Sequence, residues 1–177
     1  MIVATDYDKN KNIMAISLVN ALLEYHEKPV FLCVGSDKVI GDSVGVLVGE
    51  LLSKKYQING YVYGNLDNCV TARNLDNTIY EIKKTHPYSP IVVVDGVLGE
   101  THEIGSVKYY PYPSIPGGVY NKGTLVGDYS ILGVVDVKGI DSLSLIKSVK
   151  LTNVIKMAEF IAESIVRAYK FSQNLIV

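Results

Sequence analysis

Residues 91–94 restrict the fold more than any other segment, because four consecutive β-branched residues stand directly before Asp95 and Gly96. A continuously apolar, β-branched run is typical of a strand that is covered on both faces, as in the parallel sheets of α/β proteins. Residues 30–34 form a second apolar run of this kind. The two runs predict neighbouring strands in a sheet that lies between layers of helices.

The remaining segments alternate in their periodicity along the chain. Apolar residues recur at helical spacing in 12–25, 43–55, 71–84 and 148–173, whereas shorter runs at 58–63, 104–110 and 129–137 are typical of strands. Strands that alternate with helices indicate βαβ units. No repeat or linker divides the sequence, so we expect one α/β domain over residues 1–177.

The composition excludes several classes of protein. Hydrophobic residues make up 48% of the 177 residues and charged residues 20%, which is enough apolar surface for a folded core. The formal net charge is -1, and no basic stripe is present that would neutralise nucleic-acid phosphates. We see no signal peptide and no apolar run of about 18 residues, so we expect a cytoplasmic protein without a membrane span. Cys33 and Cys69 are expected to be free thiols.

Two aspartates follow the predicted sheet strands and are the best candidates for chemistry. Ligands of an open, mostly parallel sheet bind outside the carboxyl ends of its strands. The run 30–34 leads into a glycine-containing loop that ends at Asp42, and the run 91–94 ends at Asp95. If these strands are neighbours, the two carboxylates face one crevice, where one pKa rises because both cannot ionise cheaply. Such a pair can share a proton and activate water, or it can hold a divalent metal.

Each aspartate also has a purely structural interpretation. Asp42 immediately precedes a predicted helix, and Asp is a preferred N-cap residue. Asp95 before Gly96 can simply end a strand in a turn. Neither position is specific alone, so the functional hypothesis depends on their joint placement.

A third carboxylate and a long loop could belong to the same crevice. Asp128 lies between residues 111–123 and the predicted strand 129–137, so it could reach the crevice or remain a solvated turn residue. Residues 111–123 contain three prolines and three glycines without helical or strand periodicity, which predicts an ordered or gated loop. The tyrosines of this region could line a peptide groove or pack the loop onto the domain.

Other familiar site patterns are missing from the sequence. The glycine loop 35–45 matches neither G-x-G-x-x-G nor G-x-x-x-x-G-K-[ST], which argues against a nucleotide site. His26, His86 and His102 have no zinc-site spacing, and neither cysteine has the surroundings of a catalytic nucleophile.

Several sequence blocks together resemble the YyaC sporulation-protein family. They are C-V-G-S-D-x-x-x-G-D-S-V-G-x-L-V-G at 33–49, V-D-x-x-L-G at 94–99, G-S-V at 105–107, P-G-G-V-x-N-K at 116–122 and V-G-D at 126–128. The resemblance runs from about residue 30 to the C-terminal helix. Residues 1–29 fall outside it and are expected to form an N-terminal helical extension of a core over 30–177.

The resemblance implies a fold and a site. The YyaC family is similar to the germination protease of bacterial spores and, more distantly, to hydrogenase-maturation endopeptidases. These proteins share a phosphorylase/hydrolase-like fold, a three-layer α/β/α sandwich around a mixed, mostly parallel sheet. In the germination protease, two aspartates placed like Asp42 and Asp95 are the proposed catalytic pair. The maturation endopeptidases bind nickel with acidic residues at those positions plus a histidine. This chain has no histidine in the matching stretch, and Asp128 lies near that stretch in the sequence. The resemblance therefore implies a site made of carboxylates alone.

We therefore hypothesise a peptidase of sporulation or germination, in which Asp42 and Asp95 activate water and Asp128 is a supporting carboxylate or third ligand. Asn121 and Lys122, in the loop 111–123, would bind substrate. The expected partner is a protein or peptide such as a small acid-soluble spore protein, and the expected location is the cytoplasm, including that of the forespore. We expect no resident cofactor, with a divalent metal and a homo-oligomer left open. The alternatives are a non-catalytic binding or scaffold protein and a metal-dependent hydrolase.

Overall fold

The computed structural model describes residues 2–25, 27–117, 124–137 and 149–175. In chain order, the elements are β1 (Ile2–Ala4), α1 (Tyr7–Leu23), β2 (Val30–Cys33), the 3-10 turn η1 (Ile40–Asp42), α2 (Val44–Glu50), the π-helical turn η2 (Leu51–Lys55), β3 (Tyr61–Tyr63), α3 (Leu75–Thr85), β4 (Ile91–Gly99), the 3-10 turn η3 (Thr101–Glu103), β5 (Val107–Tyr110), β6 (Tyr129–Val137) and α5 (Leu151–Leu175).

The six strands form one mixed sheet in the order β1-β5-β6-β4-β2-β3. Strand β2 is parallel to both β3 and β4, and β4 is parallel to β6. Strand β5 pairs antiparallel with β1 and with β6. The expected mixed, mostly parallel sheet is therefore confirmed, and the two apolar runs of the sequence are adjacent strands at its centre.

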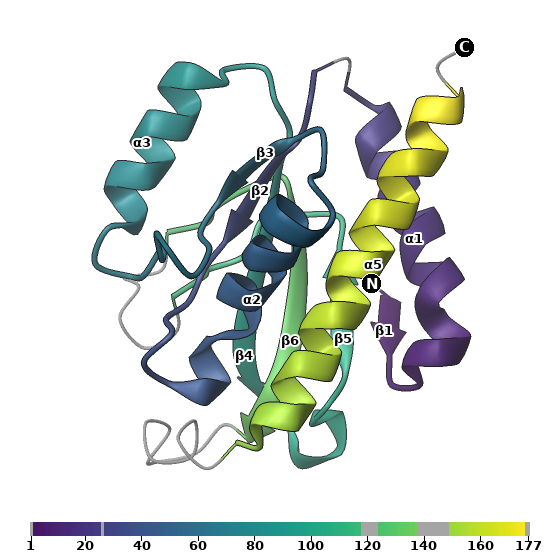
Figure 1. Cartoon of the computed structure of the whole chain (residues 1–177), viewed down its shortest axis with the longest axis vertical. Helices are drawn as coiled ribbons and strands as arrows, with labels where there is room; N and C mark the ends of the chain where they lie inside the picture. The colour runs from purple at the N-terminus through teal and green to yellow at the C-terminus, as the bar shows by residue number, and fades with distance from the viewer. Residues whose placement is uncertain (1, 26, 118–123, 138–148, 176–177) are drawn as a thin grey trace.

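Helices cover both faces of this sheet, which confirms the three-layer α/β/α architecture. On one face, apolar side chains of α1, α2 and α5 pack against alternate residues of β2, β4 and β6, including Phe31, Val92 and Ile131. On the other face, α3 packs through Leu75 and Ile82 onto Leu32 and neighbouring valines. Figure 1 shows α2 and α5 crossing the face nearer the viewer, with α1 beside α5 and α3 set apart from them.

Two elements differ from the expected boundaries in ways that affect the site. Residues 2–4 were expected in a helical extension, but they form β1, which extends the sheet through β5. Strand β4 was expected to end before Asp95, but it continues to Gly99 because β6 pairs with it beyond the point where β2 stops. Within the described residues, no helix is both long and apolar enough to cross a membrane.

Candidate active site

The backbone around Asp42 is fixed by a tight loop after β2. Ser36 donates its backbone N–H to the Asp42 carbonyl at 2.9 Å, and the Asp42 N–H donates to the Val39 carbonyl at 2.9 Å. Gly35 has a φ of 145°, and a Cβ on this residue would lie 2.0 Å from the Asp42 carbonyl oxygen. Glycine at position 35 therefore allows the loop to fold back and hold Asp42 at the end of β2.

The loop and the helix that follows it lie directly on the backbone of the sheet. A Cβ on Gly45 would lie 2.1 Å from the Val34 carbonyl oxygen and 2.7 Å from that of Val94, so the first turn of α2 rests on β2 and β4 together. A Cβ on Gly96 would lie 2.7 Å from the Gly41 carbonyl oxygen. The Gly41 backbone thus abuts the α2-facing side of Gly96, and Asp42 lies near enough to Asp95 for its negative charge to raise the pKa of Asp95.

Asp95 projects from the middle of β4 toward the interior. Alternation along the strand places it on the same face as Val93, the face covered by α3, at the level where β2 has ended. Its side chain is 1% exposed. The Oδ2 atom accepts a hydrogen bond from the Gly117 N–H at 3.0 Å, whereas Oδ1 has no partner among the described residues. A buried carboxyl oxygen without a donor is unfavourable when charged, so this arrangement favours a protonated Asp95.

Burial raises the pKa of both carboxyl groups, but to different degrees. Loss of hydration raises the pKa of Asp42 to about 6. Loss of hydration also raises the pKa of Asp95 to about 8, and the nearby negative charge of Asp42 adds to the rise, while N–H donation from Gly117 opposes it. Near pH 7, Asp42 is therefore mainly ionised and Asp95 mainly protonated. Two carboxyl groups with separated pKa values are the usual arrangement of a general base beside a general acid.

A segment that we call the strap, residues 112–117, covers Asp95. The Ser130 hydroxyl donates to the Tyr112 carbonyl at 2.9 Å, and Ser114 pairs with Val126 in an antiparallel bridge. The strap ends at Gly117. Its φ of 85° lies in the left-handed region, which favours glycine. The Gly117 N–H is a site group that the sequence reasoning missed, although a proline–glycine pair at 116–117 signals a position with special backbone geometry.

The structural interpretation of Asp42 as a helix cap is not supported. Helix α2 begins at Val44 with Ser43 as its N-cap residue, and no side chain caps it by a hydrogen bond. Asp42 instead ends the 3-10 turn η1, one residue earlier. Within the described chain its carboxylate has no hydrogen-bond partner, which leaves it available to a ligand or to water.

The expectation that Asp128 reaches the same crevice is wrong. Its Oδ2 accepts the Ile91 N–H at 2.8 Å, and its own N–H donates to the Ile91 carbonyl at 2.8 Å, so Asp128 holds the first residue of β4. Four residues of strand separate Ile91 from Asp95, which corresponds to about 13 Å. Asp128 therefore lies at the amino end of the strands and Asp95 toward their carboxyl end.

The sequence left a divalent metal ion open at this site, and the described residues can be compared with known metal sites. No group of three or more His, Cys, Asp or Glu side chains that could hold a metal ion occurs among them. With Asp128 at the other end of β4, Asp42 and Asp95 are the two predicted carboxylates that remain near one another among the described residues, whereas transition-metal and zinc sites of proteins usually have three or more protein ligands. Asn121 and Lys122, the predicted substrate-binding residues, lie outside the described residues.

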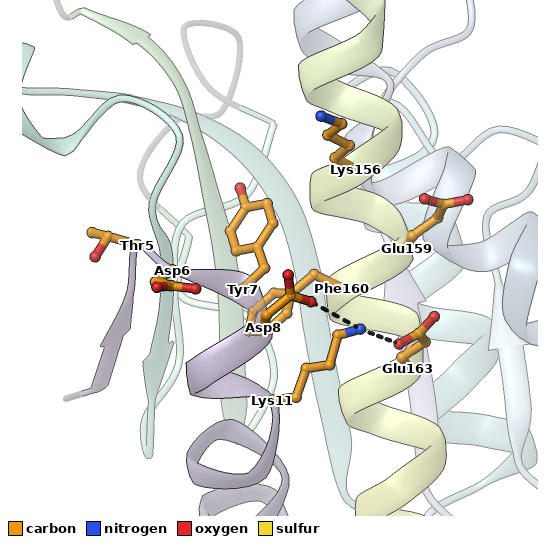
Figure 2. Close-up of a pocket in the computed structure, with 9 residues that line it drawn as sticks. All are labelled: Thr5, Asp6, Tyr7, Asp8, Lys11, Lys156, Glu159, Phe160 and Glu163. Carbon is orange, nitrogen blue, oxygen red and sulfur yellow. Dashed lines mark ion pairs between the residues drawn. The ribbon is translucent and has the colours of Figure 1, made fainter.

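A separate hollow lies between the start of α1 and α5, and Figure 2 shows its lining. Its volume is about 610 Å³. The Tyr7 ring stacks on Phe160 with the ring centroids 4.6 Å apart, and Lys11 bridges the carboxylates of Asp8 and Glu163. Neither Asp42 nor Asp95 lines this hollow. Lys11 pairs with two of the lining carboxylates, as is common on a solvated surface between two packed helices.

Comparison with known proteins shows a family and similarities to individual proteins. The family model described as a protein of unknown function, DUF1256, matches residues 2–164 and so includes the N-terminal segment that the sequence resemblance left out. The chain is 35% identical over 163 residues to the uncharacterized protein YyaC of Bacillus subtilis (strain 168), covering 91% of this chain and 79% of YyaC. A crystal structure of the [NiFe] hydrogenase maturation protease HycI from Thermococcus kodakarensis KOD1 is similar with a TM-score of 0.46 and 19% identity, covering 82% of this chain and 98% of HycI.

Proposed function

The chain belongs to the DUF1256 family, and we propose that it is a peptidase in which Asp42 and Asp95 activate water against a peptide bond. The observation that supports this proposal is the proximity of a half-buried and a buried carboxyl group: the negative charge of Asp42 raises the pKa of Asp95, and the Gly41 backbone packs against Gly96. A peptide substrate is suggested because the quoted sequence blocks resemble the YyaC family, which is similar to the germination protease.

The two aspartates would have different roles in hydrolysis. Ionised Asp42 accepts a proton from water as the water oxygen forms a bond to the peptide carbonyl carbon. Protonated Asp95 then gives its proton to the amide nitrogen as the carbon–nitrogen bond breaks. The products are a carboxylic acid and an amine, and the proton on Asp42 passes to Asp95 before the next cycle. This sequence needs no metal ion and uses the pKa order of the pair.

Access of substrate to Asp95 requires movement of the strap. Asp95 is 1% exposed, and Gly117 occupies the position beside its Oδ2. A substrate that reaches Asp95 therefore displaces the Gly117 N–H and replaces it with a donor of its own. The substrates we propose are small acid-soluble spore proteins, which would assign the protein to sporulation or germination and to the forespore.

Proteolysis of purified small acid-soluble spore proteins tests this proposal. We expect wild type to cleave them and Asp42→Asn and Asp95→Asn to be slower by at least about 100-fold, because each substitution removes a proton-transfer group. Asp76→Asn, on the first turn of α3, is the matched control and should cleave normally. Equal cleavage by wild type and Asp42→Asn would remove Asp42 from the mechanism. If wild type binds these proteins without cleaving them, the non-catalytic scaffold is favoured. The burial of Asp95 is compatible with that alternative.

A further inference from the structure

Next to the carboxylate pair, the strap is held in a fixed register by a second segment of chain. Ser114 and Val126 exchange both backbone hydrogen bonds of an antiparallel bridge, at 3.2 Å from the Ser114 N–H and 2.8 Å from the Val126 N–H. Directly opposite residues of an antiparallel pair point to the same face, and the next residues along each segment point to the other face. This register therefore decides which side chains of the strap face solvent.

The residues at the bridge are buried, whereas the apolar residues next to them are exposed. Val126 is 4% exposed and packs among the apolar residues beneath α3, and the Ser114 Oγ is buried. The residue after Ser114 is Ile115 and the residue before Val126 is Leu125, and these are 48% and 65% exposed. Two large aliphatic side chains are thus exposed to solvent next to the bridge, one on each segment.

Ile115 is close along the chain to a group that contacts Asp95. Ile115 is two residues before Gly117, whose N–H contacts Asp95. Two residues of extended chain span about 6.6 Å, which is also the spacing of successive same-side residues in an extended peptide. The residues 111–117 and 124–127 contain no charged side chain, so nothing in either segment would attract a basic or acidic substrate residue.

We propose that Ile115 and Leu125 form a subsite that receives an apolar side chain of the substrate peptide within two positions of the cleaved bond. This inference rests on the proposed peptidase function and specifies its substrate class, an extended peptide with an aliphatic or aromatic residue near the cut. The Ser114–Val126 bridge anchors the subsite, so that Gly117 can leave Asp95 without dispersing the two apolar side chains.

Cleavage of a synthetic peptide library, followed by mass spectrometry, tests the subsite. Wild type should prefer Leu, Ile, Val, Met or Phe at one position near the cut. The double variant Ile115→Thr/Leu125→Thr should lose about tenfold or more in kcat/KM for those peptides and little for peptides with Ala or Ser there, because only the apolar contact is removed. Ile16→Thr, which replaces a 62% exposed residue of α1, is the control and should retain the preference.

Two results would overturn the subsite even if the protein is a peptidase. One is an unchanged side-chain preference in the double variant, and the other is an equal loss for every peptide. Should wild type cleave nothing, the proposed function fails, and binding then tests the subsite alone. We expect acetyl-Leu-Leu-amide to shift the NMR methyl signals of Ile115 and Leu125 in Asp95→Asn more than acetyl-Ser-Ser-amide does. Equal or absent shifts would contradict the proposal.

Discussion

The substitution Asp95→Asn should make the free energy of unfolding less sensitive to rising pH. The Asp95 side chain is 1% exposed, and burial raises its pKa from 3.8 to about 8. A group whose pKa is higher in the folded state stabilises that state at low pH and loses this contribution as pH rises toward the folded value. Between pH 4 and pH 8, Asp95 is ionised in the unfolded chain but mainly protonated in the folded chain. Wild type should therefore lose stability as the pH rises through this range, whereas Asn cannot ionise.

The magnitude follows from the size of the pKa shift. Each pKa unit corresponds to about 1.4 kcal/mol, so the folded state loses about 4 kcal/mol between pH 4 and pH 7. Asn keeps an acceptor for the Gly117 N–H but places a buried NH₂ group near the position of Oδ1, which costs about 1–3 kcal/mol at every pH. The difference in unfolding free energy between Asp95→Asn and wild type should thus shift by about 4 kcal/mol in favour of the variant over this range.

Urea unfolding measures this difference directly. The chain has 13 tyrosines and no tryptophan, so tyrosine fluorescence and circular dichroism can follow the transition at each pH. The exposed Asp76→Asn variant is the control and should track wild type at all pH values. Parallel pH profiles for wild type and Asp95→Asn would refute the reasoning, because they would mean that Asp95 ionises equally easily in the folded and unfolded chains.

Three further predictions concern catalysis and the framework of the site. Peptide cleavage should have a bell-shaped pH profile, rising as Asp42 ionises near pH 6 and falling as Asp95 loses its proton near pH 8; a monotonic profile would contradict the assigned roles. Gly45→Ala should lower the free energy of unfolding by about 3 kcal/mol or prevent folding, because the new Cβ would overlap the Val34 carbonyl. Gly105→Ala has open space but a φ of 82° and should cost about 1–2 kcal/mol. Equal losses in the two variants would argue against the close approach of α2 to the sheet. Asp128→Ala should destabilise the protein by about 1 kcal/mol in urea unfolding and leave cleavage unchanged, so a loss of activity like that of Asp42→Asn would return Asp128 to the site.

The centre of the sheet could be predicted because its strands are buried on both faces. The short apolar runs at 30–34 and 91–94 are typical of strands covered on both faces, and β2 and β4 are indeed adjacent. The same reasoning about parallel strand ends predicts that Asp42 lies near Asp95. By contrast, the end of β4 was not predictable from its own residues, because β6 extends it to Gly99 beyond the last pairing with β2.

The failures come from contacts between distant segments. Strand β1 has only three residues, and its pairing with β5 about a hundred residues later leaves no local pattern. The error on Asp128 was avoidable: a residue that precedes a strand parallel to β4 must lie at the amino edge of the sheet, opposite the carboxyl ends where ligands bind. The Gly117 N–H lies in a segment without periodicity, so its contact with Asp95 depends on how the strap is anchored at Ser114 and Ser130.

NMR titration of the side-chain carboxyl carbons of Asp42 and Asp95, in wild type and in Asp42→Asn, tests most directly whether these residues share a site. We predict elevated pKa values of about 6 for Asp42 and about 8 for Asp95 in wild type. In Asp42→Asn the pKa of Asp95 should fall, because the neighbouring negative charge is gone. Ordinary values near 4 for both groups, or an Asp95 titration that is unchanged by the substitution, would contradict the account.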